Sequence, residues 1–238
     1  MGLIKAAVYD ALIMFLWIFC VSTVGVFTSL IATFINAQGL VPNLLITTCL
    51  IASLIFIFNI ICDALGGASF NPTGTAAFYA SGYGGGTLLS MALRFPAQAL
   101  GAAGGVLAIL EFMPPQYKHM LGGPSLKVDA HTGAIAEGVL TFLITFTVLW
   151  IIIKGPRNSI IKAWMLAAST VAFVVAGSGY TGPSMNPANA FGWAYIDNLH
   201  NTWEHFYVYW ISPFIGAITA SWLFRMIFPP LAAKVKKA

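Results

Sequence analysis

Two segments of similar sequence each contain an Asn-Pro pair, and these pairs are the residues of the chain best suited to chemistry in apolar surroundings. Residues 67–73 read GASFNPT and residues 182–188 read GPSMNPA. Asn is a favoured helix N-cap and Pro is favoured at the first helical position, so each pair is expected to begin a helix. One Asn-Pro pair is also typical of a turn, but two matching copies favour a paired functional site. Its motif residues are Asn71, Pro72, Thr73, Asn186, Pro187 and Ala188.

The composition indicates that these pairs belong to an integral membrane protein. The chain is 59% hydrophobic and 8% charged, whereas roughly a quarter of the residues of a soluble domain are charged. The net charge of +4 comes from few ionisable groups at the ends and in loops, so no nucleic-acid partner is expected. The three cysteines lie in apolar stretches and the four histidines lack metal-ligand spacing, so no metal site or cofactor is predicted. Surface positions are expected for the histidines, with gating by pH as the alternative.

The elements that must position the pairs follow from hydropathy. About 20 apolar residues cross a bilayer, and six stretches are long enough to do so. These stretches are residues 6–34, 43–62, 91–110, 133–153, 163–178 and 203–228. Between the second and third span of each half, the Asn-Pro pairs open segments that are too short to cross, residues 71–80 and 186–197. The predicted fold class is therefore an all-α membrane protein with six transmembrane helices and two half-helices.

The two halves are expected to form an inverted repeat. Each half has three spans, so the second half enters the membrane from the opposite side, which is typical of conduction and transport sites. We expect one channel domain over residues 1–238, with halves of about 1–113 and 130–238 joined by a linker of about 114–129. With both termini in the cytosol, all of the 11 Lys and Arg residues except Lys118 and Lys127 lie on that side, as the positive-inside rule requires.

Two Asn-Pro half-helices in inverted halves resemble the aquaporin, or major intrinsic protein, family, and the resemblance covers nearly the whole chain. Glu137, Thr141 and the segment 97–102 also resemble family positions. Four residues depart from the usual pattern and resemble the plant small basic intrinsic proteins, in the branch whose first motif ends in Thr. They are Asp10, Ser69, Thr73 and Asn189.

The resemblance implies roles for further residues. A constriction outside the Asn pair would be formed by Ile51, Val174, Pro183 and Asn189. Two intramembrane acids, Asp10 and Glu137, would brace the loop before each Asn-Pro pair, with a proton relay as the alternative role. The resemblance also implies a homotetramer with one pore in each protomer.

These features favour a passive channel for water that excludes ions and protons. Two facing helix N-termini would oppose a monovalent cation by about 4 kcal/mol, while the amides of Asn71 and Asn186 would donate hydrogen bonds to water. Thr73 is expected to tolerate Ala, because its hydroxyl can bond back to the turn. A channel for glycerol or hydrogen peroxide is the alternative. A secondary transporter is less favoured because the broken segments carry no carboxylate, and no residue constellation predicts an enzyme.

The C-terminal tail contains a possible signal for the membrane in which the protein resides. Lys234 and Lys236 stand five and three places from the end, which resembles the Lys-x-Lys-x-x retrieval signal of the endoplasmic reticulum. Attraction of the same lysines to anionic lipid is the alternative. We expect a multi-pass protein of the endoplasmic reticulum membrane.

Overall fold

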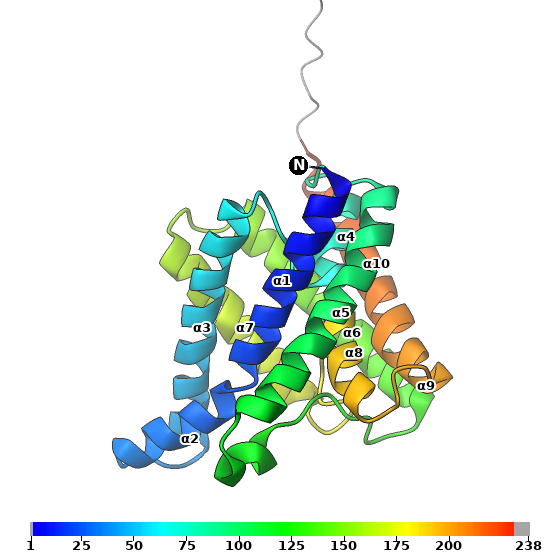
Figure 1. Cartoon of the computed structure of the whole chain (residues 1–238). Coiled ribbons are helices and arrows are strands. Elements are labelled where there is room, and N and C mark those ends of the chain that lie inside the picture. The colour runs from blue at the N-terminus through cyan, green and yellow to red at the C-terminus, as the bar shows by residue number, and fades with distance from the viewer. Residues whose placement is uncertain (1, 231–238) are drawn as a thin grey trace, which may run out of the picture.

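The computed structural model describes residues 2–230, and all regular elements in that range are helical (Figure 1). The first half contains α1 (Leu3–Val21), α2 (Val24–Phe34), α3 (Leu40–Ala64), α4 (Pro72–Ser81) and α5 (Leu88–Phe112). A 3₁₀ turn, η1 (Pro115–Met120), follows in the linker. The second half contains α6 (Ala130–Ile153), α7 (Ser159–Gly177), α8 (Pro187–Ile196), α9 (Trp203–Phe206), the π-helical η2 (Tyr207–Ile211) and α10 (Ser212–Ile227). Lys234 and Lys236 of the predicted retrieval signal lie outside the described residues.

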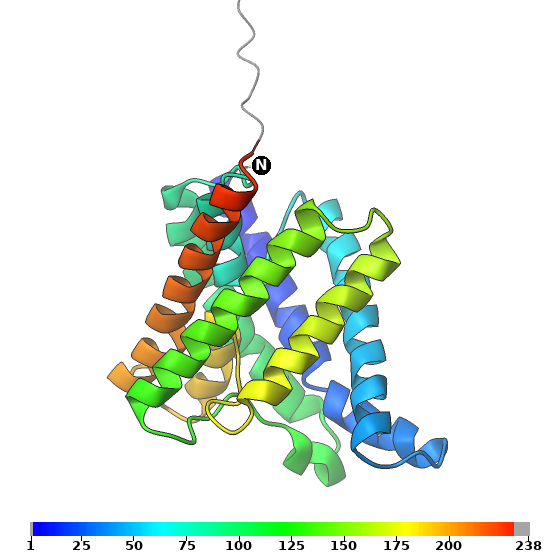
Figure 2. The same ribbon diagram turned by 180° about the vertical axis from the view of Figure 1, so that it is seen from behind.

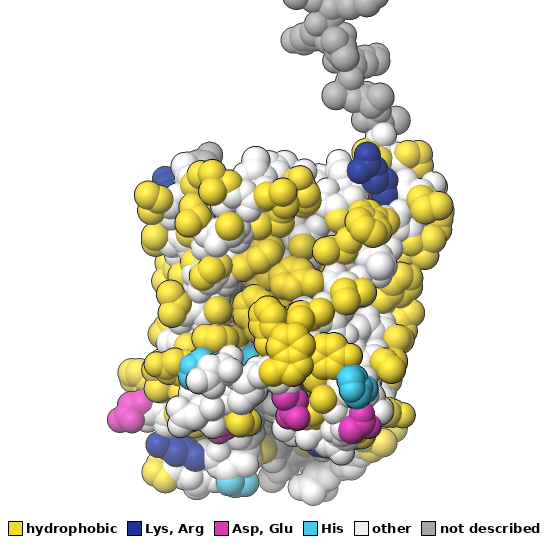
Figure 3. All heavy atoms as spheres, turned by 90° about the vertical axis from the view of Figure 1, so that its right-hand side faces the viewer, with side chains coloured by type: hydrophobic (Ala, Val, Ile, Leu, Met, Phe, Trp, Pro, Cys, Tyr) yellow, Lys and Arg dark blue, Asp and Glu magenta, His cyan; other side chains and the backbone are white. Residues whose placement is uncertain are grey.

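Within residues 2–230, six helical stretches are long and apolar enough to cross a membrane, which confirms the predicted fold class. They are Leu3–Phe34, Leu40–Ala64, Leu88–Phe112, Ala130–Ile153, Ser159–Gly177 and Trp203–Ile227. The half-length helices α4 and α8 lie between the second and third span of each half, as expected. Figure 3 shows a broad apolar band over the middle of one face, with acidic and His side chains gathered at the end opposite the N-terminus.

Each half-helix packs against the other half of the molecule. Helix α4 contacts α10, and α8 contacts α5, while α4 and α8 also contact each other. The long helices pair within each half as α1 with α5 and α6 with α10, and α3 packs on α7 across the halves. Figures 1 and 2 show α4 and α8 enclosed among these longer helices. The two Asn-Pro starts therefore meet inside the bundle.

Glycines allow the paired long helices to approach closely. A Cβ at Gly105 of α5 would lie 2.6 Å from the carbonyl oxygen of Phe15 in α1, which is too close for any side chain. A Cβ at Gly216 of α10 would overlap the carbonyl oxygen of Gly138 in α6. Small residues permit such contacts between membrane helices.

The first span is not the single helix that hydropathy predicted. It breaks at Ser22 and Thr23, and α2 turns away from the line of α1 (Figure 1). The Ser22 hydroxyl donates to the carbonyl oxygen of Ile18 at 2.7 Å, and the Thr23 hydroxyl donates to that of Cys20 at 2.7 Å. The backbone amides of Ser22 and Thr23 also donate to these two carbonyl oxygens, at 3.1 Å each, so each hydroxyl adds a second bond at the break.

Side-chain caps begin the second half. The Asp129 carboxylate accepts hydrogen bonds from the backbone amides of His131 at 3.1 Å and Thr132 at 3.0 Å, which starts α6. Hydrogen bonding from Thr132 holds the pKa of Asp129 below its usual range.

In the last span, Pro213 lacks an amide hydrogen and follows directly on the π-helical η2 and Ser212. The wider turn there lets the Ser212 hydroxyl donate to the Ala134 carbonyl of α6.

Candidate functional site

The candidate site is built on the N-termini of α4 and α8. Asn71 has extended backbone angles, and its Oδ1 accepts the amide of Thr73 at 3.0 Å. Asn186 has the same geometry, and its Oδ1 accepts the amides of Ala188 at 3.2 Å and Asn189 at 3.3 Å. Pro72 and Pro187 occupy the first helical positions, where a missing amide hydrogen costs nothing.

The two caps are hydrogen-bonded to each other's loops. Asn71 Nδ2 donates to the carbonyl oxygen of Met185 at 3.2 Å, and Asn186 Nδ2 donates to that of Phe70 at 2.8 Å. Each side-chain amide carries two hydrogens, so one hydrogen of each remains for another acceptor. The sequence predicted free amide donors and missed these cross-half bonds, because nothing local indicates which carbonyl faces which Asn.

Thr73 adds a third bond across the halves. Its hydroxyl lies 3.1 Å from the Met185 carbonyl oxygen and 2.7 Å from Asn71 Oδ1, and the residue is 2% exposed. A hydroxyl has one hydrogen, so these two acceptors share it. The matching position in α8 is Ala188, which has no hydroxyl. The first motif therefore makes one more contact across the halves than the second motif does.

A serine two places before each Asn supports each loop. The Ser184 hydroxyl donates to the carbonyl oxygen of Asn186 at 2.7 Å and accepts the side-chain amide of Asn189 at 3.0 Å. The Ser69 hydroxyl, in the first loop, accepts the hydroxyl of Thr75 at 2.9 Å. Asn189 thus donates one of its two side-chain amide hydrogens to the loop before α8.

Glu137 holds the loop before α8. This fully buried carboxylate accepts the Thr181 hydroxyl at 2.8 Å, the Ser184 amide at 3.0 Å and the Met185 amide at 2.6 Å. Met185 has a positive φ of 51°, a conformation that costs energy for a residue with a side chain. The bond from its amide to Glu137 stabilises that conformation and aims its carbonyl at Asn71 and Thr73.

Asp10 holds the loop before α4 in a similar way, but it is also paired with the cationic side chain of Arg94. It accepts the Ser69 amide at 2.8 Å, Gln98 Nε2 at 2.6 Å, and Arg94 through Nε at 2.7 Å and Nη2 at 2.8 Å. The sequence indicates Arg94 only as one of the charges expected on the cytosolic side, and no local pattern indicates its ion pair with Asp10. Within residues 2–230 no such salt bridge is present for Glu137, so the two acids are stabilised differently.

The four predicted constriction residues lie in different surroundings. Pro183 is buried and lies where a Cβ on Gly177 of α7 would overlap it, and Val174 lies about one turn away on α7. Asn189 is half-buried in the first turn of α8. Ile51 of α3 packs in an apolar cluster with residues of α7. Their grouping into one filter stays a prediction.

A cavity of about 390 Å³ reaches the first motif between α3, α4 and the loop before α4. Its polar lining includes Asn59, Ser69, Asn71, Thr75 and Arg94. No group of three or more His, Cys, Asp or Glu residues suited to a metal ion occurs in the described part of the chain.

One histidine departs from the predicted surface position. His205 is 6% exposed, and the Thr202 hydroxyl accepts its backbone amide at 3.1 Å at the start of α9. Its ring packs 6.5 Å from Phe191 and 5.5 Å from Tyr209, measured between ring centroids. The predicted surface position is therefore wrong for His205.

Comparisons with known proteins agree with this architecture. A family model described as Major intrinsic protein matches residues 1–224. Aquaporin SIP1-2 of Zea mays is 63% identical over 237 residues, covering 99% of this chain and 98% of that protein. Aquaporin SIP1-1 of Arabidopsis thaliana is 56% identical over 238 residues, covering 100% and 98%. The X-ray structure of the aquaglyceroporin from Plasmodium falciparum matches with a TM-score of 0.70 at 16% identity, covering 96% of this chain and 98% of that one, which is a likeness of fold.

Proposed function

This chain belongs to the major intrinsic protein family, and from that premise we propose that it is a passive channel that conducts water past Asn71 and Asn186. Membership makes it a multi-pass integral membrane protein of the aquaporin channel family and not an enzyme. The finer proposal concerns which residues meet the solute and which solute passes.

The observation that carries the proposal is that the side-chain amides of Asn71 and Asn186 each have one hydrogen that is not donated to the opposite loop. Each Asn Nδ2 gives one hydrogen to the opposite loop, to Met185 or Phe70, and keeps one. A water oxygen between the two Asn side chains would accept the remaining hydrogens, which would turn its own hydrogens outward and interrupt proton transfer along the file. The positive ends of the α4 and α8 dipoles would repel cations, and weak hydrogen bonds keep passage fast.

The constriction of Ile51, Val174, Pro183 and Asn189 would set the solute range. Asn189 is the one side chain of the four with hydrogen-bonding groups, and one of its amide hydrogens is already given to Ser184. Such a filter offers few replacements for the hydrogen bonds of water, each worth about 1 kcal/mol net. It also carries no charge, so small neutral solutes such as glycerol or hydrogen peroxide are the second candidate class.

The proposal also covers the domain, the assembly and the membrane in which the channel works. We assign residues 1–238 to one channel domain with halves of about 1–113 and 130–238, and we expect a homotetramer with both termini in the cytosol. The proposed address is the endoplasmic reticulum membrane, through Lys234 and Lys236.

Osmotic shrinkage of liposomes, followed by light scattering, tests the water proposal. Liposomes with the purified protein should shrink faster than empty ones. Asn186→Leu should reduce the flux per folded protein about fivefold, since the hydrogen bond from Asn186 to passing water, worth about 1 kcal/mol, is lost along with its helix cap and its bond to Phe70. Asn43→Leu is the matched control, because Asn43 is an exposed amide in the first turn of α3. Water flux equal to that of empty liposomes would reject the proposal.

The same liposomes test the solute range. With glycerol as the osmolyte, the parent protein should allow re-swelling, and Asn189→Arg should slow it by adding a bulky fixed charge. If Asn189→Arg passes glycerol as fast as the parent does, Asn189 is not part of the filter.

A further inference from the structure

The linker between the two halves packs beside the proposed constriction. A Cβ on Gly123 of the linker would overlap the Trp193 side chain, so the linker lies directly on α8. A Cβ on Gly182 would lie 3.5 Å from the Ser125 amide nitrogen, so the linker also lies against the residue before Pro183. Two of the segments that carry constriction residues, α8 and the loop before it, therefore contact this one stretch of chain.

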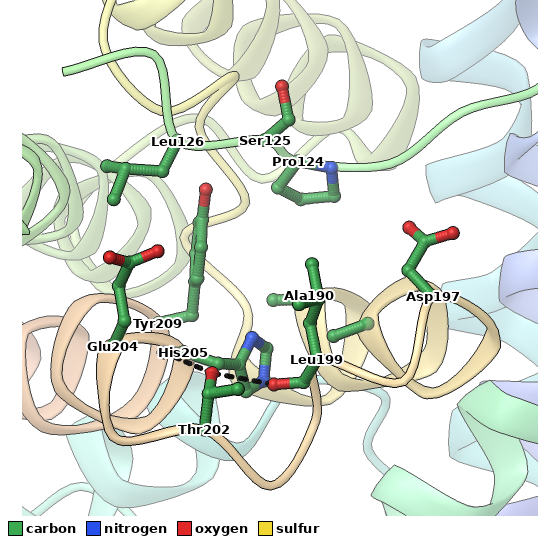
Figure 4. Close-up of a pocket in the computed structure, with 11 residues that line it drawn as sticks. Pro124, Ser125, Leu126, Ala190, Asp197, Leu199, Thr202, Glu204, His205 and Tyr209 are labelled. Atoms are coloured by element: carbon green, nitrogen blue, oxygen red, sulfur yellow. Dashed lines mark hydrogen bonds between the residues drawn. The ribbon is translucent and has the colours of Figure 1, made fainter.

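The same stretch of the linker is hydrogen-bonded to the loop that follows α7. The Ser125 amide donates to the Thr181 carbonyl oxygen at 3.0 Å, and the Lys127 amide donates to that of Tyr180 at 2.8 Å. The Tyr209 hydroxyl donates to the same Thr181 oxygen at 2.9 Å, and Figure 4 shows this hydroxyl pointing toward the linker. These backbone bonds align the linker with the loop, but they do not reach α7 itself.

The Lys127 side chain connects the linker to the end of α7. Its Nζ donates to the carbonyl oxygen of Ser178, the C-cap residue of α7, at 2.8 Å. Among residues 2–230 no other donor is bonded to this oxygen. Carbonyls at a helix C-terminus have no partner within the helix, and the helix dipole is negative there, so a cation is favoured. Lys127 thus caps α7 from a distant part of the sequence.

A shift of this helix end would change the constriction. Ser178 lies one turn beyond Val174 on the same side of α7, because residues four apart on a helix share a face. A Cβ on Gly177 would overlap the Pro183 ring, so the end of α7 is in direct contact with the loop before α8. The bond at Ser178 therefore acts on the separation of Val174 and Pro183.

We propose that Lys127 is a positioning residue for the solute selectivity of the channel. Its bond to Ser178 holds the end of α7 against the linker and keeps Val174 close to Pro183, which limits the width of the constriction. This role rests on the proposed channel and its constriction. Lys127 is exposed, so replacing it leaves no cavity and no buried charge, and the fold should be kept.

Two permeabilities of the same liposomes test this role. The ratio of glycerol re-swelling to osmotic water shrinkage does not depend on the amount of folded protein. Lys127→Met removes the ammonium group but keeps a chain of similar length, and should raise this ratio about threefold, the effect of losing one partly exposed hydrogen bond. Lys127→Arg keeps a cationic donor and should give the ratio of the parent. Lys118→Met is the matched control, because Lys118 is an exposed lysine of the same linker outside this contact.

Hydrogen exchange gives a second readout that does not need flux. The amides of Ser125 and Lys127 are protected by their bonds to the loop after α7. Lys127→Met should speed deuterium uptake in residues 122–129, measured by mass spectrometry of the protein in nanodiscs, whereas Lys118→Met should leave it unchanged.

Either a parent-like permeability ratio or parent-like exchange in Lys127→Met would overturn the proposal, as would an equal rise in the ratio with Lys118→Met. Absence of water flux in the parent would reject the channel itself. Normal water flux with an unchanged ratio rejects only the role of Lys127.

Discussion

A single hydroxyl distinguishes the two Asn-Pro motifs at the residue scale. Thr73 follows the first pair, and its hydroxyl reaches the Met185 carbonyl of the other half, whereas Ala188 follows the second pair and makes no such bond. The sequence indicated that Thr73 tolerates Ala, because a hydroxyl bonded only to its own turn adds little. The second acceptor revises that expectation, since the turn and the opposite half now share one hydrogen.

We therefore expect Thr73→Ala to destabilise the protein by about 1 kcal/mol, the usual net worth of one buried hydrogen bond. Thr73→Ser keeps the hydroxyl and should lose less. The measurement is the midpoint of thermal unfolding of the purified proteins in one detergent. Equal midpoints for the Ala and Ser variants would show that the hydroxyl makes no stabilising contact across the halves.

The Arg94–Asp10 pair carries a larger predicted effect. Asp10 is fully buried, so Arg94→Gln would leave a carboxylate without its cation at a cost of about 3 kcal/mol or more. Asp10→Asn with Arg94→Gln removes both charges and should recover part of the loss. A double-mutant cycle on unfolding midpoints checks this, and additive effects of the two single variants would contradict the pairing.

Local chemistry explains which elements could be predicted from the sequence. Apolar length gave the spans, and the Asn-Pro pairs gave the starts of α4 and α8, because both signals lie within a few consecutive residues. The break at Ser22 and Thr23 lies between apolar stretches and leaves no hydropathy signal. The Met185 carbonyl oxygen accepts bonds from Asn71 and Thr73 only because two loops far apart in the sequence meet in space. No local pattern in the sequence indicates that meeting.

Close helix approach gives the prediction at the scale of the element. Gly216→Ala puts a Cβ against the backbone of Gly138, which cannot move like a flexible side chain, so α6 and α10 must separate. We expect a destabilisation of about 1–3 kcal/mol and less monodisperse protein in size-exclusion chromatography. Gly25→Ala in α2 is the matched control, because a Cβ there meets nothing within 4 Å. Equal behaviour of the two variants would show that the α6–α10 contact adapts freely.

At the scale of the whole molecule, both ends of the described chain lie at one end of the bundle. Figures 1 and 2 show the start of α1 and the end of α10 close together there, and the acidic and His side chains of Figure 3 gather at the other end. An even number of spans requires this arrangement, and our proposal that the shared end lies in the cytosol rests on the bias of Lys and Arg. A cytosolic tail is what a Lys-based retrieval signal needs.

The last prediction separates retrieval from lipid attraction. Retrieval reads Lys234 and Lys236 by their places relative to the C-terminus, whereas attraction to anionic lipid depends on charge alone, at about 1 kcal/mol for each Lys. Lys234→Ser with Lys236→Ser should therefore release the protein from the endoplasmic reticulum to later membranes, as seen by microscopy of a fusion labelled at the N-terminus. Replacing both residues with Arg keeps the charges and their places, so release of the Arg variant as well identifies a signal that recognises lysine itself, while retention of the Arg variant and release of the Ser variant identifies charge. Retention of both variants would remove the tail as the address.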